Sequence, residues 1–223
     1  MPFWLFSATS PSAFRMFPTL IRARAGSFGL SQVSVQSGQT PPGGGPLFSD
    51  SFDTGTAAWT PSGPWGVTSM AGRETAYAAT RNGSEQVSYA GSVTWTNYAV
   101  SAWVNIVNTS GGVSLLGRVV DSTHYYLLEI KPTQAGTVNW FLTKRDGAAW
   151  TALANGRFTD PPGTWLNLRL TMTGSSLRAE YSLDGSTFTT LGTATDTRFA
   201  AGRIGLRAWG SVAYFDDVLA QAT

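Results

Sequence analysis

Two clusters of aspartates carry the side chains best suited to metal chemistry. Asp50 and Asp53 lie near the start of a β-rich segment, and Asp216 and Asp217 lie near its end. Carboxylate oxygens are the ligands that Ca²⁺ prefers, and the terminal strands of a β-sandwich are often neighbours. The four aspartates are therefore candidates for one structural calcium site. The alternative is that they are solvated charges at turns and sheet edges.

The adjacent pair sets a limit on such a site. Successive residues of a strand point to opposite faces of the sheet. We therefore expect at most one of Asp216 and Asp217 to join a given site, unless a backbone carbonyl contributes a ligand.

Groups for catalysis are few. His124 is the only histidine and there is no cysteine, which excludes disulfides, Cys–His pairs and multi-histidine metal sites. No Gly-x-Ser-x-Gly elbow occurs, and the four glutamates are scattered singly, so no strand offers two carboxylates on one face as a glycosidase would. We expect a protein that is not an enzyme, with His124 at a strand edge or on the surface.

The elements that position these residues are β-strands. In residues 98–106, an apolar face alternates with a polar one, which is the period of a half-buried strand. Strands are expected at residues 98–106, 113–120, 123–130, 137–144, 164–172, 176–183, 203–209 and 212–219. Turn sequences such as Arg145-Asp-Gly147 separate them, and no helical stretch interrupts them. The pattern predicts an all-β, two-sheet antiparallel jelly-roll sandwich.

Residues 1–46 differ from the remainder and are expected to form an extended N-terminal arm and linker. The boundary is the stretch Thr40-Pro-Pro-Gly-Gly-Gly-Pro46, which favours neither helix nor strand. The arm contains no acidic residue and is too apolar for a solvated tail. It is also too short and too broken by proline to make its own core. Its candidate assembly contacts are the aromatic residues Phe3, Trp4, Phe6, Phe14, Phe17 and Phe28.

Charge and hydropathy limit the partners. The arm holds three basic residues, and residues 47–223 hold 12 basic and 13 acidic residues. A segment so close to neutrality gives no reason to expect binding to nucleic acid, which needs clustered Lys and Arg. No apolar run approaches the roughly 20 residues of a transmembrane helix, and the N-terminus lacks the basic region of a signal peptide.

Residues 47–223 resemble the concanavalin A-like, laminin G-like jelly rolls. The resemblance rests on Leu47-Phe-Ser-Asp-Ser-Phe-Asp-Thr-Gly55, Trp95-Thr-Asn-Tyr98, Gly117-Arg-Val-Val-Asp121, Trp165-Leu-Asn-Leu-Arg-Leu170, Gly202-Arg-Ile-Gly-Leu206 and Phe215-Asp-Asp-Val218. It implies a structural calcium between the first and last strands, at Asp50 and Asp216. Ser51 stands where many relatives carry a second acid. The Glu-x-Asp-x-x-Glu strand of the laminarinase-like enzymes is absent.

The resemblance also implies that a sugar would bind on the concave sheet. Aromatic rings there would stack on pyranose rings, and Arg and Glu would hydrogen-bond to hydroxyls. Alternation places the candidates on polar strand faces; they are Trp103, Arg118, Tyr125, Glu129, Arg207 and Trp209. The alternative for Trp103 and Trp209 is that they lie beneath a covering loop or the arm.

Two functions remain open. The first is a non-catalytic structural protein whose arm tethers the jelly roll to other subunits, as a homo-oligomer in a phage virion decoration, head-fibre or tail component. This predicts a location on a virion or an extracellular surface. The second is a soluble carbohydrate-binding module that contacts surface glycans. A glycoside-active enzyme is the third and least supported reading.

Overall fold

The described part of the chain is built of β-strands. The computed structural model describes residues 45–70, 72–80, 85–107, 109, 111–159 and 163–223, and these contain fifteen strands and no helix. They accordingly include no helix long and apolar enough to cross a membrane. The predicted arm lies outside the described residues up to residue 44, and this covers all six of its aromatic candidates, Phe3, Trp4, Phe6, Phe14, Phe17 and Phe28.

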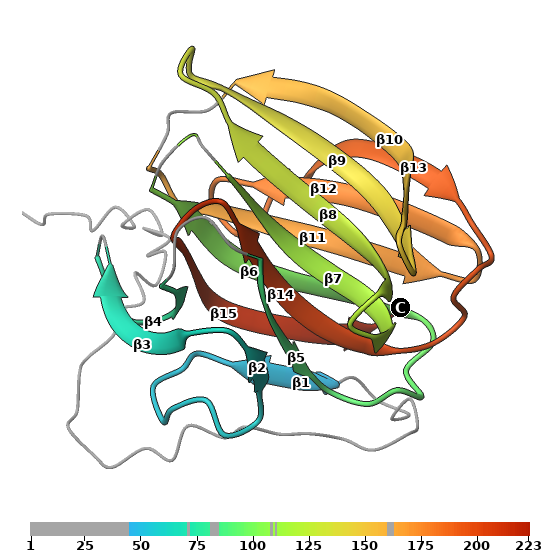
Figure 1. Cartoon of the computed structure of the whole chain (residues 1–223), viewed down its shortest axis with the longest axis horizontal. Helices are drawn as coiled ribbons and strands as arrows, with labels where there is room; N and C mark the ends of the chain where they lie inside the picture. Colours follow the sequence, from blue (N-terminus) through green and yellow to red (C-terminus); the bar gives the residue numbers. More distant parts are fainter. Residues whose placement is uncertain (1–44, 71, 81–84, 108, 110, 160–162) are drawn as a thin grey trace, which may run out of the picture.

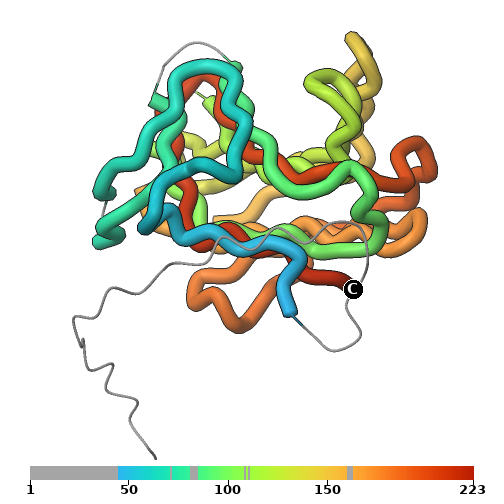
Figure 2. The backbone as a smooth tube through the Cα atoms, turned by 90° about the horizontal axis from the view of Figure 1, so that it is seen from below, coloured from blue at the N-terminus to red at the C-terminus, as the bar shows by residue number. Residues whose placement is uncertain are grey.

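The strands form two antiparallel sheets (Figure 1), which Figure 2 shows as two layers. Sheet A contains, in spatial order, β13 (Thr189–Thr195), β12 (Ser176–Ser182), β11 (Leu166–Thr173), β6 (Tyr98–Ile106), β15 (Ala213–Ala222), β4 (Arg73–Ala79) and β3 (Trp65–Met70), and β1 (Phe48–Asp50) also pairs with β15. Sheet B contains β10 (Ala149–Thr159), β9 (Thr137–Asp146), β8 (His124–Pro132), β7 (Gly112–Asp121), β14 (Arg203–Trp209), β5 (Gln86–Ala90) and β2 (Thr60–Ser62). The predicted all-β, two-sheet antiparallel sandwich is confirmed.

The main core lies between the two sheets. In β6, Tyr98, Val100 and Ala102 are buried and alternate with half-buried residues of the outer face. In β7 and β8, Leu115 and Leu128 lie opposite each other and belong to the same core. Each strand therefore contributes alternate side chains to one apolar layer, which provides the main hydrophobic stabilisation of the sandwich.

Sheet B carries a second apolar cluster on its outer face. Leu116 and Leu127 are paired in register one position beyond the core residues, so they point away from the core. They are nevertheless buried, in a cluster completed by Val87, Tyr89, Val119 and Tyr125. Large side chains therefore cover this face of sheet B, and the candidate site is built among them.

The sequence pattern missed the edge strands β2, β3, β10 and β13, and also β4 and β5, each of which lies next to an edge strand. β6 has the predicted bounds, residues 98–106, and the other predicted strands shift by a few residues. No strand was predicted over β10 or β13, which form one edge of each sheet and consist mainly of exposed or half-buried residues. An edge strand with little burial on either face lacks the alternation that marks a strand in sequence.

Two bulges redirect functional side chains. The register of β7 against β8 shifts after Gly117, and Arg118 takes a positive φ of 48°. The register of β15 against β6 shifts after Asp216, and Asp217 takes a positive φ of 47°. Extra residues in a bulge re-aim the side chains next to them.

Candidate functional site

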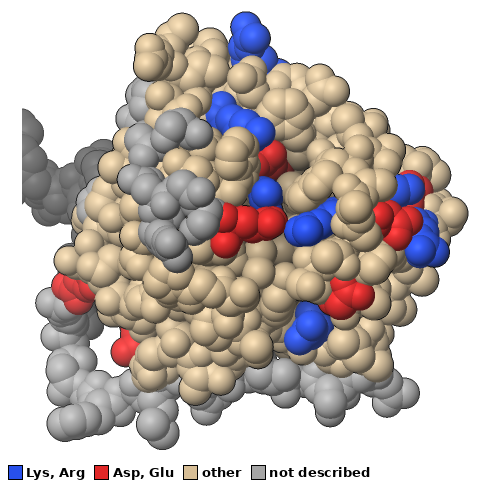
Figure 3. Space-filling model, in the orientation of Figure 1, with Lys and Arg blue, Asp and Glu red and all other residues tan. Residues whose placement is uncertain are grey.

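The outer face of sheet B gathers aromatic and charged side chains from four strands and one loop. We call it the aromatic–charged face; its residues are Glu85, Tyr125, Glu129, Lys131, Phe141, Arg145, Trp150, Arg207 and Trp209. The register aligns Arg207 with Ser114, Ser114 with Glu129, and Glu129 with Phe141. Figure 3 looks onto this side of the molecule, where acidic and basic side chains gather near the middle.

Four side chains form a continuous polar network on this face. Arg207 Nε donates to Glu85 Oε1 over 2.6 Å, and its Nη1 donates to Glu129 Oε1 over 3.2 Å. The indole N–H of Trp209 donates to the same oxygen of Glu129. Arg207 and Glu129 are each only 7% exposed. Charged groups held in a partly dry environment make stronger hydrogen bonds than they do in water.

Cations hold the aromatic rings in place. The guanidinium carbon of Arg145 lies 4.9 Å from the ring centre of Trp150 and 5.7 Å from that of Tyr125. Arg145 Nη1 also donates to the Tyr125 hydroxyl over 2.9 Å. Lys131 Nζ lies 4.5 Å from the ring centre of Trp209. Trp150 is 47% exposed, so a large part of this ring is accessible to a ligand.

Several buried polar atoms on this side of sheet B lack a hydrogen-bond partner. Ser114 Oγ, the Tyr89 hydroxyl and Arg203 Nε are three of them. Burial raises the pKa of Tyr89 to about 12, so its hydroxyl remains protonated at neutral pH and can donate. A buried polar group without a partner costs about 1–3 kcal/mol. A ligand with hydroxyl groups can recover part of this cost.

Small residues make room for the large ones. A Cβ atom at Gly112 would collide with the carboxylate of Glu129 and would lie 2.9 Å from Trp209 Nε1. One at Gly205 would lie 3.0 Å from the Tyr89 ring. At these glycines, β7 and β14, which lie between β8 and β5 in the sheet, form a low floor beside the larger side chains.

The structure brings together four of the six residues that the sequence suggested for a glycan site. Tyr125, Glu129, Arg207 and Trp209 lie on the aromatic–charged face. Strand alternation placed these four on one face because each lies within a correctly predicted strand.

The other two candidates lie elsewhere. Trp103 is on the outer face of sheet A, where the guanidinium carbon of Arg73 lies 4.9 Å from its ring centre. Arg118 is buried at one end of the sandwich, where its side chain donates to the carbonyls of Thr96 and Phe199. Alternation could not locate Arg118, because the bulge in β7 turns it away from the polar face of the strand.

Sequence reasoning missed Glu85, Lys131, Phe141, Arg145 and Trp150. A signal for two of them was present in the hairpin whose turn is Gly147-Ala148. A two-residue turn there pairs Arg145 with Trp150, and Tyr125 is the partner of Arg145 on the other side. Glu85 follows residues 81–84, which lie outside the described ranges, and no pattern in the sequence pointed to it.

The aspartates proposed for calcium do not fit that ion. Asp50 Oδ1 accepts a hydrogen bond from the Phe52 amide over 2.8 Å, and Oδ2 accepts one from the Trp59 indole over 2.9 Å. Both oxygens therefore face N–H donors. Burial raises the pKa of Asp50 above its ordinary value. Asp53 lies in the turn after β1 and not in the strand; it accepts from Thr75 Oγ1 over 2.6 Å.

At the other end of the chain, an arginine occupies the place that a cation would take. Arg73 Nη1 contacts Asp216 Oδ2 at 2.6 Å and Asp217 Oδ2 at 2.8 Å. This corrects the expectation that the two aspartates would point apart, because the bulge in β15 turns Asp217 toward the same partner. The described residues contain no group of three or more His, Cys, Asp or Glu side chains able to hold a metal.

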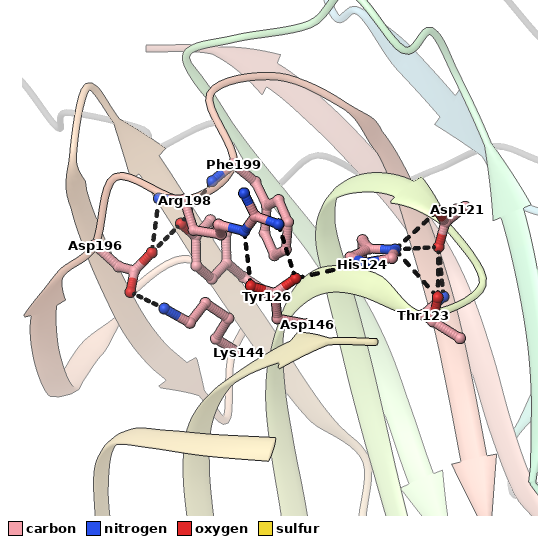
Figure 4. Close-up of polar contacts among 9 residues, drawn as sticks. All are labelled: Asp121, Thr123, His124, Tyr126, Lys144, Asp146, Asp196, Arg198 and Phe199. Carbon is pink, nitrogen blue, oxygen red and sulfur yellow. Dashed lines mark hydrogen bonds and ion pairs between the residues drawn. The ribbon is translucent and has the colours of Figure 1, made fainter. Parts of the chain in front are cut away.

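His124 does not have the geometry of a catalytic triad (Figure 4). Both Thr123 Oγ1 and Asp121 contact its Nδ1, at 3.1 and 2.8 Å, while Asp146 lies 3.4 Å from its Nε2. A triad places the hydroxyl and the carboxylate on opposite ring nitrogens. His124 instead joins the β7–β8 turn to the end of β9.

Comparisons with known proteins support the fold. No family model matches the chain, and no curated protein matches its sequence. Among solved structures, the carbohydrate-binding module CBM66 from Bacillus subtilis has a TM-score of 0.57 at 17% identity, and the match covers 74% of this chain and 96% of that one. The CBM2 module of the evolved Dit protein of Lactobacillus casei BL23 phage J-1 has a TM-score of 0.55 at 15% identity, covering 79% and 95%.

A third similar structure is the exoplasmic/lumenal domain of VIP36 in its Ca²⁺/Man2-bound form. Its TM-score is 0.57 at 11% identity, and the match covers 77% of this chain and 83% of that domain. Identities this low establish a shared fold and leave the ligand open. The chain folds as a jelly-roll sandwich of the kind found in carbohydrate-binding modules, which agrees with the resemblance to concanavalin A-like domains.

Proposed function

We propose that this protein binds carbohydrate, without catalysis, through the aromatic–charged face of sheet B. The observation that carries the proposal is the half-exposed ring of Trp150, flanked by Arg145 and Arg207 and close to the carboxylate of Glu85. Aromatic rings provide an apolar surface for the C–H face of a sugar, and fixed charged groups bind its hydroxyls.

The neighbouring structures support the same function. The B. subtilis and phage J-1 structures are both carbohydrate-binding modules, and the VIP36 domain was solved with Man2. A role in binding is also consistent with the geometry of His124, and with the ion pairs that engage Glu85 and Glu129 with Arg207. Carbohydrate binding, the second function left open by the sequence, is therefore better supported than an assembly role alone.

A glycan array followed by titration calorimetry tests the proposal. Trp150→Ala should weaken binding of the best array ligand about tenfold or more, because it removes the exposed stacking surface. Trp103→Ala is the matched control, since it removes a tryptophan from the opposite sheet, and it should leave affinity within about twofold. Equal losses in both variants, or an array without any ligand, would contradict the proposal. Release of reducing sugar during the titration would contradict its non-catalytic part.

A tether to a larger assembly is the second candidate function. Two observations favour it: the similarity to a module of a phage Dit protein, and the acid-free, aromatic composition of residues 1–46. In this proposal the sandwich is displayed on a virion or another extracellular surface and binds glycans there, and the arm contacts other subunits. Removal of residues 1–46 should then abolish self-association without unfolding the sandwich.

A further inference from the structure

Arg118 is a buried cation at one end of the sandwich. Its backbone lies in the β7 bulge, where the amide donates to the Tyr98 hydroxyl over 2.6 Å. Its side chain is directed to the loops that precede β6 and β14: Nε donates to the Thr96 carbonyl over 3.1 Å, and Nη1 donates to the Phe199 carbonyl over 3.0 Å. The whole residue is 1% exposed. These bonds use two of the five N–H donors of the guanidinium.

No carboxylate neutralises this charge within the described part of the chain. Figure 4 shows three acids of this part of the chain, each engaged with another group. Asp196 contacts Lys144 at 2.6 Å, and Asp146 contacts Arg198 at 2.7 Å. Asp121 contacts His124 at 2.8 Å. Burial lowers the pKa of Arg118, which reflects the cost of keeping a cation away from water and without an anion.

Arg118 lines an open pocket of about 280 Å³. The other polar lining groups include the side chains of Asn97, Ser175 and Thr197, and the apolar ones include Phe199 and Ala200. The side-chain oxygen of Asn97, Oδ1, accepts a hydrogen bond from the Gly174 amide. The side-chain NH₂ group of Asn97 is therefore directed away from that bond and remains a donor. The pocket therefore combines a buried cation, neutral hydrogen-bonding groups and one apolar wall, in a volume suited to a ligand the size of a monosaccharide.

We propose that this pocket binds the carboxylate of a small acidic ligand, with a hexuronic acid as the sugar form of that ligand. The planar guanidinium matches the geometry of a carboxylate. The hydroxyl and amide groups suit ring hydroxyls, and Phe199 offers an apolar surface. The pocket is formed by different residues from those of the aromatic–charged face, so the proposal goes beyond the proposed function and does not depend on it.

Calorimetric titration of the full chain with D-glucuronate tests the charge requirement. D-glucuronamide has the same ring and lacks the charge. We expect glucuronate to bind about tenfold more tightly or better, because hydrogen bonds to a charged partner are the stronger ones. Titration with acetate distinguishes a small acid from an acidic sugar as the natural ligand. If acetate binds as tightly as glucuronate, the site is one for small acids; if acetate binds more weakly, the site is one for acidic sugars.

A charge placed in the pocket provides the second test without removing Arg118. Thr197 is exposed in the loop before β14, and Thr197→Glu offers Arg118 a carboxylate from the protein itself. This variant should weaken glucuronate binding about tenfold, whereas Thr197→Gln, which has the same size and no charge, should stay within about threefold.

Folding of both Thr197 variants is checked by their melting temperatures. If wild-type protein binds glucuronate and glucuronamide equally, or binds neither, the proposal is overturned. Equal weakening by Thr197→Glu and Thr197→Gln would overturn it as well, because bulk and not charge would then decide binding.

Discussion

Glu180 illustrates how a single buried charge is stabilised in this sandwich. At 3% exposure it is the least exposed carboxylate in the described ranges. Arg169 binds both of its oxygens, at 2.8 and 2.9 Å, and Arg178 Nε lies 3.2 Å away. Burial alone raises the pKa of Glu180, but the hydrogen bond and charge of Arg169 and the charge of Arg178 outweigh it, so the pKa lies below its ordinary value.

Replacement of this carboxylate should therefore have a pH-dependent effect. A carboxyl with a depressed folded-state pKa contributes stability above its unfolded pKa of about 4.3, and this is lost as the pH falls through the folded pKa. Glu180→Gln should lower the free energy of unfolding by about 1–2 kcal/mol at pH 7, allowing for the partial exposure of Arg169. The difference from wild type should shrink below about pH 4.

Urea unfolding at pH 7, 5 and 3 measures this effect. Gln221→Ala, at an exposed position of β15, is the control and should change stability by less than about 0.5 kcal/mol at each pH. A pH-independent loss in Glu180→Gln would show that its shape and not its charge matters.

At the same scale, the site could be predicted from the sequence only in part. Residues in regular strands, such as Tyr125 and Glu129, follow from alternation and resemblance. The position of Arg118 could not be predicted in this way, because a bulge interrupts the alternation of its strand. The orientation of Asp217 was predicted wrongly for the same reason. Trp103 has the predicted orientation on its strand but belongs to the other sheet, and which sheet a strand joins is decided by long-range pairing.

At the scale of elements, most interior strands were predictable, whereas the edge strands and the interior strands β4 and β5 were not. Strands such as β6 and β14 bury one face against the core, and their other face is half-buried or lies beside apolar side chains. The period-2 alternation is therefore clear in their sequences. β10 contributes Trp150 to the site although much of the strand is exposed. The residue on which the proposed function depends most therefore came from an element that the sequence pattern did not predict.

The floor of the aromatic–charged face gives a prediction at this scale. Gly112→Ala adds a methyl group where Glu129 and Trp209 meet. We expect stability to fall by about 1–3 kcal/mol, the usual cost of overpacking. Glycan affinity should also fall, by about tenfold, because the network from Glu129 to Arg207 has to move.

Gly66→Ala in β3 is the matched control, because a Cβ atom there meets nothing within 4 Å. Calorimetry and thermal unfolding of both variants separate the two effects. Wild-type affinity in Gly112→Ala would mean that the Glu129–Trp209 contact does not shape the ligand site.

At the scale of the whole molecule, the sandwich and the arm can be separated experimentally. Leu47 is buried and its amide donates to the Ala220 carbonyl over 2.8 Å. A chain that begins at Leu47 therefore keeps all fifteen strands of the described residues. Deletion of residues 1–46 should leave the melting temperature within a few degrees of the full chain, since the core residues all remain.

Sedimentation velocity of the full and shortened chains measures the assembly part of the same prediction. The full chain should sediment as an oligomer and the shortened chain as a monomer. On a glycan-coated surface, the oligomer should also dissociate more slowly, because several faces engage at once. If both chains sediment as monomers, the arm does not mediate self-association and the proposed tether is wrong.

The pairing of β1 with β15 has a consequence for how this sandwich can be used. Phe48 lies opposite Ala220, three residues before the last residue, Thr223. First and last strands that pair with each other favour circular permutation and domain insertion. The sandwich from β1 to β15 can therefore be grafted as a cassette into a surface loop of a host protein, or relinked and reopened at the Gly147-Ala148 turn, with both of its sheets intact.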